Sequence, residues 1–232
     1  MGTDWPDQTD WILLPGTLCT DAVFAPFLDY LGVGQNRRKP VAIDRPAIGE
    51  YRDELASSAR GAVVCGFSLG AIIAAHLADR LDAKRIILFA LNPFPDDPAK
   101  ATARHDLSSD LAARGGASAL APRLPPLSGP KPGQAHKTIL DMANMSASYI
   151  AAQTQLALTR PNALAALSRT QAPVMVLTGT EDLMAPMAQG QAASDAAPNG
   201  RFASLQGLGH YALLEDPELC ARSLLELEAA RP

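Results

Sequence analysis

Residues 62–81 have the sequence AVVCGFSLGAIIAAHLADRL, and this stretch decides the fold. The apolar run at its start has the length of a buried strand, and the alanine-rich part from Leu69 to Leu81 is typical of a helix. Gly66 and Gly70 bracket Ser68, so the turn between strand and helix carries no bulk on either side. A strand that passes through such a turn directly into a helix predicts an alternating α/β architecture.

Other short apolar runs in the chain have the same character. They lie at residues 11–14, 41–44, 85–91, 174–177 and 201–205. Segments with helical spacing separate most of them, at residues 21–31, 50–59, 186–197 and 217–230. Continuous apolar strands that alternate with helices indicate a sheet covered on both faces. We therefore predict an α/β fold with a mainly parallel sheet flanked by helices.

Residues 94–159 break this alternation. The segment is rich in proline and glycine, and helical spacing returns only near residues 106–114 and 136–158. Such a region between two strands is typical of a helical insertion joined by loops. We predict a core made of residues 1–93 and 160–232, with residues 94–159 inserted as a helical cap.

The composition is that of one ordinary globular domain. The chain has 232 residues, 47% of them hydrophobic and 19% charged, which excludes disorder along its whole length. A net charge of −4 argues against a nucleic-acid partner. No apolar run approaches the roughly 18 residues that a membrane span requires. We predict neither nucleic acid nor membrane as a partner, and the choice between monomer and homodimer stays open.

The N-terminus and the cysteines predict where the protein resides. The first ten residues, MGTDWPDQTD, contain three aspartates and no lysine or arginine, unlike a signal peptide. Cys19, Cys65 and Cys220 are too widely spaced to indicate a disulfide framework or a pair of metal ligands. The sequence therefore predicts a cytoplasmic protein without a metal site.

Ser68 is the candidate nucleophile. The turn raises its hydroxyl above the sheet edge at a helix N-terminus, where free N–H groups favour negative charge. A serine needs a base, and His210 lies in the glycine-rich segment 207–211 directly after a predicted strand. Because the carboxyl ends of parallel strands share one edge, we expect the imidazole of His210 to reach Ser68.

A carboxylate should orient that imidazole and stabilise its charged form. Asp182 follows the predicted strand at residues 174–177 and therefore lies at the same edge of the sheet. It is the favoured candidate, with Asp96 or Asp97 as the alternatives.

An oxyanion hole for the tetrahedral intermediate needs two backbone N–H donors. Leu69, directly after the nucleophile, supplies one candidate. Thr17, in the loop after the first strand, supplies the other, or Leu18 if the loop is shifted by one residue.

With these motifs the chain resembles the α/β-hydrolase fold family, in particular its small serine ester hydrolases with a helical cap. The resemblance rests on LLPGTLCTDAVF, GFSLG, VMVLTGTEDLMAP and GLGHYALLEDPE, and extends from Trp11 to about Ala229. It implies an acyl-enzyme mechanism without a cofactor. The chain departs from the family in having Pro15 where histidine is usual, and we expect the antiparallel edge strands common in the family to be absent.

The residues expected around the site are mostly apolar. The candidate pocket residues are Leu18, Phe94, Met142, Met145, Leu183 and Tyr211. No arginine or lysine is expected to face the site. This predicts a neutral, mainly apolar acyl group of modest size.

The leading hypothesis is a carboxylic ester hydrolase that acts on a small-molecule ester or thioester. Thioester hydrolysis, acyl transfer and carbon–carbon bond hydrolysis use the same three residues and remain alternatives. A hypothesis of another class is a non-catalytic ligand-binding member of the fold.

Overall fold

The sheet has six strands, all paired in parallel among the residues that the computed structural model describes, 9–230. The strand order is β2-β1-β3-β4-β5-β6. The strands are β1 (Trp11–Leu14), β2 (Arg38–Pro40), β3 (Val63–Phe67), β4 (Arg85–Phe89), β5 (Val174–Gly179) and β6 (Gly200–Leu205). The predicted α/β class and the parallel sheet are confirmed. The segment used to judge a signal peptide lies almost entirely outside the described residues.

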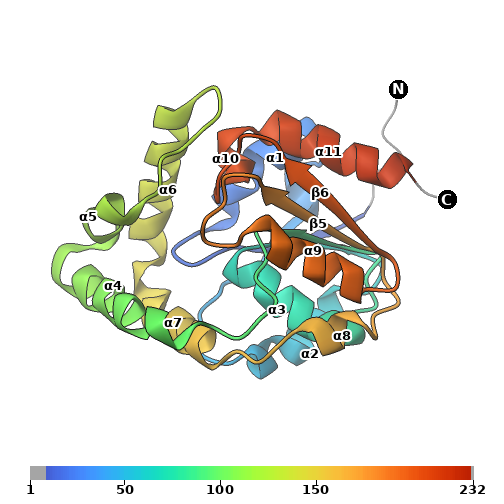
Figure 1. Ribbon diagram of the computed structural model, residues 1–232, viewed down its shortest axis with the longest axis horizontal. Coiled ribbons are helices and arrows are strands. Elements are labelled where there is room, and N and C mark those ends of the chain that lie inside the picture. The colour runs from blue at the N-terminus through green and yellow to red at the C-terminus, as the bar shows by residue number, and fades with distance from the viewer. Residues whose placement is uncertain (1–8, 231–232) are drawn as a thin grey trace.

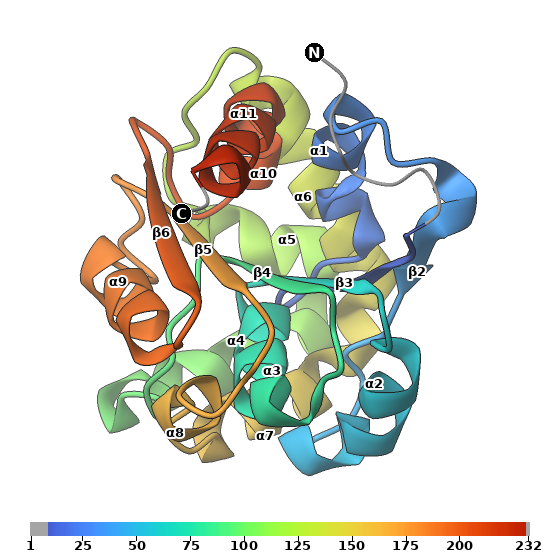
Figure 2. The same ribbon diagram turned by 90° about the vertical axis from the view of Figure 1, so that its right-hand side faces the viewer.

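Helices cover both faces of the sheet (Figure 2). One face carries α1 (Ala25–Tyr30), α10 (Ala212–Glu215) and α11 (Pro217–Ala229). The other carries α2 (Arg52–Ser58), α3 (Leu69–Leu77), α8 (Leu164–Leu167) and α9 (Met187–Ala196). Because neither face meets water, every residue of β1, β3, β4 and β5 is buried.

The core is divided by the sheet into two apolar clusters. Along β1, Trp11 and Leu13 belong to the cluster under α1 and α11, whereas Ile12 and Leu14 belong to the cluster under α2 and α3. This is the alternation that a strand imposes on successive side chains. The Phe27 ring packs edge-on against Phe89, with ring centroids 5.2 Å apart, and anchors α1 to the sheet.

Four further helices lie between β4 and β5 in the chain. They are α4 (Ala101–Arg114), α5 (Gly116–Leu120), α6 (Pro132–Ser146) and α7 (Ile150–Thr159). Figure 1 shows α4, α5 and α6, in green and yellow, gathered at one side of the sheet. We call residues 98–159 the cap helices, and the division into a core and an inserted cap at residue 94 stays a prediction.

Short 3-10 helices complete the chain. They span Asp21–Val23, Gln35–Arg37, Ile48–Tyr51, Ala78–Arg80, Pro98–Lys100, Ala121–Arg123 and Ala147–Tyr149. The last of these interrupts the single helix expected at residues 136–158. The Ser146 hydroxyl donates to the Met142 carbonyl at 2.8 Å, a side-chain bond that bends helices.

The second strand lies at Arg38–Pro40 and not at residues 41–44. Arg38 pairs with Trp11, and the strand ends at Pro40, with one further bond from the Val41 N–H to the Leu13 carbonyl at 2.9 Å. Val41 and Ile43 are nevertheless buried against the α2 side of the core. The apolar pattern of this run therefore came from loop packing, which sequence periodicity cannot distinguish from a strand.

Within residues 9–230, no helix combines the length and hydrophobicity needed to cross a bilayer.

Candidate active site

Ser68 occupies a strained turn between β3 and α3. Its backbone has φ 50° and ψ −112°, a conformation that residues other than glycine rarely adopt. A Cβ at Gly66 would lie 2.6 Å from the Ala71 Cα, and one at Gly70 would lie 1.9 Å from the Leu14 carbonyl oxygen. Both positions must therefore be glycine for the turn to close.

The structure brings Ser68, His210 and Asp182 together from three separate strand ends. His210 Nε2 lies 3.1 Å from the Ser68 hydroxyl, and His210 Nδ1 lies 2.9 Å from Asp182 Oδ2. Asp182 Oδ1 also accepts from the backbone N–H groups of Met184 and Ala185, at 2.8 and 2.9 Å. These bonds fix the carboxylate, and the carboxylate in turn fixes the imidazole.

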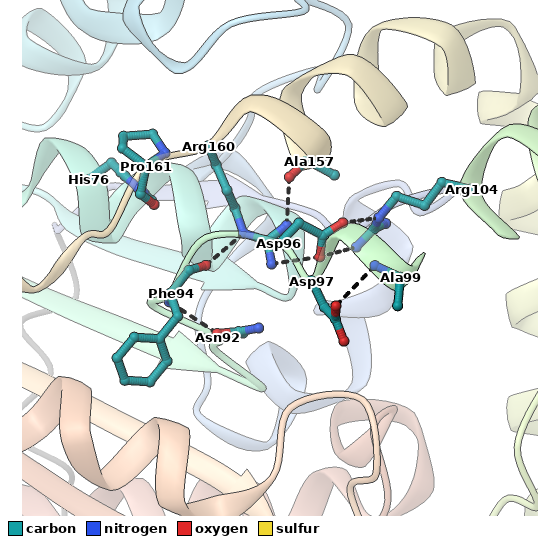
Figure 3. Close-up of polar contacts among 10 residues, drawn as sticks. All are labelled: His76, Asn92, Phe94, Asp96, Asp97, Ala99, Arg104, Ala157, Arg160 and Pro161. Carbon is teal, nitrogen blue, oxygen red and sulfur yellow. Dashed lines mark hydrogen bonds and ion pairs between the residues drawn. The ribbon is translucent and has the colours of Figure 1, made fainter. Parts of the chain in front are cut away.

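The alternative carboxylates have other partners (Figure 3). Asp96 bonds to Arg104 and Arg160, and Asp97 accepts from the backbone N–H of Ala99. Neither forms a bond with His210. Of the three carboxylates considered, Asp182 is the one that contacts the imidazole.

Two of the three candidate oxyanion donors remain free to bind a ligand. Leu69 begins α3, where the first N–H groups have no partner within the helix. The Thr17 N–H has no hydrogen-bond partner among the described residues. The Leu18 N–H is already bonded to Gln153 Oε1 at 3.0 Å, so it cannot serve without breaking that bond.

Comparison of the sequence with known protein families identifies the family of this chain. The sequence model of the alpha/beta hydrolase family matches residues 2–223. The chain belongs to the alpha/beta hydrolase family. The resemblance inferred from the motifs is therefore confirmed.

Individual relatives are distant. A Mycobacterium tuberculosis protein named "Putative non-heme bromoperoxidase BpoC" is 33% identical over 69 residues, which cover 30% of this chain and 26% of that protein. A thermophilic esterase from Thermogutta terrifontis has a TM-score of 0.76 at 17% identity, over 95% of this chain and 89% of that one. A carboxylesterase structure from Nitrososphaera gargenis has a TM-score of 0.78 at 14% identity, over 96% and 91%. At these identities the two structures show that the fold is shared.

Glu215 is a site residue that the sequence analysis missed. Its carboxylate is 1% exposed and accepts from the backbone N–H groups of Gly209 at 2.8 Å and Tyr211 at 3.1 Å. It thereby holds the main chain on both sides of His210. A third bond, 3.2 Å from the Ser128 N–H, joins this loop to the cap region. The sequence feature that could have drawn attention to Glu215 is its position directly after the apolar run Ala212–Leu214.

Gln153 is a second missed residue. It lies on α7, is 1% exposed, and donates from Nε2 to the Ile43 carbonyl at 3.0 Å while its Oε1 accepts from Leu18. Leu18 has φ 56°, so the loop that carries Thr17 is itself strained. A cap helix of this hydrolase therefore fixes the candidate oxyanion loop.

A cavity of about 530 Å³ opens beside Ser68. Of the candidate pocket residues, Leu18, Leu183 and Tyr211 line it. Phe94, Met142 and Met145 do not line it, contrary to prediction. Met142 is 1% exposed within the core and Met145 is 72% exposed to solvent, because α6 turns these side chains away from the cavity.

The prediction that no arginine or lysine faces the site is wrong. Four cationic side chains line the cavity, all from the region between β4 and β5: Lys100, Arg104, Arg123 and Arg160. Lys100, Arg104 and Arg123 belong to the cap helices and Arg160 directly follows α7, and the sequence did not reveal how these segments pack.

Cys19 is unsuited to act as a nucleophile. Burial raises the pKa of its thiol to about 12, although a hydrogen bond in the loop lowers it in part. Burial also raises the pKa of Tyr211 far above its usual range, so its hydroxyl stays protonated. Residues 9–230 contain no cluster of three histidine, cysteine or acidic side chains suited to hold a metal.

Proposed function

We propose that this alpha/beta hydrolase cleaves carboxylic esters through Ser68, His210 and Asp182. The observation that carries the proposal is the unbroken chain of hydrogen bonds from the Ser68 hydroxyl through the imidazole to a buried carboxylate. Ser68, where this chain begins, occupies a strained turn beside a cavity large enough for a small molecule. The fold shared with two esterases is consistent with this chemistry.

Each residue then has a defined task. The Ser68 oxygen attacks the ester carbonyl while its proton passes to His210 Nε2. The N–H groups of Leu69 and Thr17 stabilise the oxyanion. His210 returns the proton to the leaving alcohol, which departs as the acyl-enzyme forms. A water molecule, deprotonated by His210, then releases the acid and restores Ser68, and Asp182 stabilises the imidazolium in both steps.

The cavity wall supports a substrate with apolar parts. Leucine, isoleucine and alanine side chains from α3 and the cap helices surround the serine: Leu69, Ile72, Ala103, Leu107, Leu120 and Leu124. Thioesters fit the same geometry, because the reacting carbonyl and the oxyanion are shared.

The test is hydrolysis of p-nitrophenyl acyl esters of increasing chain length. We expect the wild type to act on them and Ser68→Ala to lose activity by several orders of magnitude. Ser57→Ala, which alters an exposed serine on α2, is the matched control and should retain full activity. Full activity in the Ser68→Ala variant would overturn the proposal.

Covalent labelling separates this proposal from a purely ligand-binding role. A fluorophosphonate probe should modify Ser68 in the folded wild type and leave Ser68→Ala unmodified. If the folded wild type neither reacts with the probe nor hydrolyses any ester or thioester, a non-catalytic binding role replaces the proposal.

A further inference from the structure

The part of the cavity wall formed by residues between β4 and β5 carries an excess of positive charge. Among the described residues that line the cavity, four are cationic and Asp96 alone is an acid. Arg160 is 4% exposed, and its three nitrogens bond to Asp96, to the Phe94 carbonyl and to the Ala157 carbonyl (Figure 3). Each guanidinium nitrogen of Arg160 therefore already has a partner within the protein.

Arg104 and Arg160 share the single carboxylate of Asp96, so these three side chains together keep one positive charge, and Arg104 is the more exposed of the two cations. Arg104 donates to Asp96 from Nε at 2.5 Å and from Nη2 at 3.0 Å. These bonds hold the guanidinium at the cavity wall and leave Nη1 without a partner among the described residues. An arginine fixed in this way loses little conformational entropy when it binds an anion.

Two neighbouring cations reinforce this charge. Arg123 shares Asp110 with Arg114, so these three side chains together keep one positive charge. The Lys100 side chain has no hydrogen bond or ion pair in the described part of the chain. Asp97, the nearest acid in sequence, does not line the cavity, because it caps the turn at Ala99.

We propose that this wall, made of Lys100, Arg104 and Arg123, binds a carboxylate carried by the substrate at the end remote from the scissile ester. The inference rests on the proposed ester hydrolysis and names its substrate class, a half-ester of a small dicarboxylic acid. The apolar side chains of Leu107, Leu120 and Leu124 lie in the same cavity and suit the hydrocarbon between the two ends. This replaces the neutral acyl group expected from the sequence.

The experiment compares charged and neutral esters of matched length. The probes are mono-p-nitrophenyl esters of linear dicarboxylic acids of about four to eight carbons, each paired with the p-nitrophenyl ester of the monocarboxylic acid of the same length. Spontaneous hydrolysis is subtracted for every probe. We expect kcat/KM of the wild type to be higher for the charged member of at least one pair.

Arg104→Met tests the assignment, because Asp96 keeps its bond to Arg160 when Arg104 is removed. We expect kcat/KM to fall about ten- to a hundredfold for the charged ester, mainly through KM, and to stay within about twofold for the neutral ester. Arg52→Met is the matched control, since Arg52 is an exposed arginine on α2 that neither lines the cavity nor contacts the wall residues, and it should change neither value. An equal effect of Arg104→Met on both esters would overturn the proposal.

Two further measurements keep the test decisive. If Arg104→Met does not fold, Lys100→Met and added potassium chloride should each raise KM selectively for the charged esters, and unchanged values would contradict the proposal. Calorimetry on Ser68→Ala measures binding without catalysis. It compares the monoethyl ester of a dicarboxylic acid with the ethyl ester of the monocarboxylic acid of the same length. Selective binding there, with no ester hydrolysis by the wild type, would refute the proposed reaction while supporting the anion site.

Discussion

At the scale of single residues, the position of His210 depends on a carboxylate outside the chain of reacting groups. Glu215 accepts from the N–H groups of Gly209 and Tyr211 and so holds the main chain on either side of the imidazole. Each of its three bonds has a backbone donor, which a carboxylate satisfies and an amide nitrogen does not. Glu215 is therefore a positioning residue for His210.

Glu215→Gln should impair turnover more than binding. One amide nitrogen would face a backbone N–H, and the loop would shift. We expect kcat for ester hydrolysis to fall about ten- to a hundredfold with KM changed little. Glu218→Gln, which alters another acid on the neighbouring helix, is the control and should behave as the wild type. A rise in KM at unchanged kcat would contradict the positioning role.

Gln153→Leu should loosen the candidate oxyanion loop. The substitution leaves the Leu18 N–H and the Ile43 carbonyl without partners, at a cost of about 1–3 kcal/mol for each buried group. We expect lower stability in urea denaturation and a lower kcat. Gln155→Leu, which alters an exposed glutamine on the same helix, should change neither, and equal behaviour of the two variants would refute this role for Gln153.

At the scale of elements, Asp96 ties the end of α7 to the start of α4 through Arg160 and Arg104 (Figure 3). Burial by itself raises the pKa of this carboxyl, but the hydrogen bonds and charges of the two guanidiniums more than offset it and lower the pKa below 3.8. The ionised form is therefore favoured by folding. Its contribution to stability is present above pH 3.8 and is lost as the pH falls through the lower, folded value.

Asp96→Asn should destabilise the protein by about 3 kcal/mol at pH 7, because it leaves a buried guanidinium unpaired. The difference from the wild type should shrink as the pH falls below 3.8. Urea denaturation at neutral and acidic pH measures both values. Asp97→Asn, which keeps a side-chain acceptor for the Ala99 N–H, is the control, and a difference independent of pH would contradict the ion-pair account.

At the scale of the whole molecule, all three cysteines belong to the same buried cluster between the sheet and α1, α11 and the cap helices. Burial raises the pKa of each thiol above its ordinary value of 9.0. The thiols therefore stay protonated in the folded state and ionise once the chain unfolds. Above pH 9 this difference favours the unfolded state, so stability should fall as the pH rises.

Cys65→Ala measures this effect for one thiol. The variant should have a lower free energy of unfolding than the wild type. This difference should shrink by about 1.4 kcal/mol per pH unit above pH 9, because the variant lacks the Cys65 thiol that ionises on unfolding. Native wild type should also leave a disulfide reagent unreacted until denaturant is added. Rapid reaction of the folded protein, or a difference constant up to pH 10.5, would contradict this account.

The sequence by itself determined the class of fold and the three residues that meet at the sheet edge. The G-x-S-x-G turn, the glycine-rich segment before His210 and the strand before Asp182 are local patterns, set by backbone sterics and by side-chain period. In a parallel sheet these patterns also fix which ends of the strands lie together. The roles of the three residues in a reaction remain predictions.

Only the tertiary structure decided what surrounds those residues. Gln153 and Leu18 are 135 positions apart, and their bond exists because α7 packs beside the first loop of the core. Lys100, Arg104 and Arg123 belong to the cap helices, whose proline- and glycine-rich links carry no signal of how the helices are oriented. The charge of the cavity therefore follows from the packing of segments distant in sequence, which no local pattern encodes.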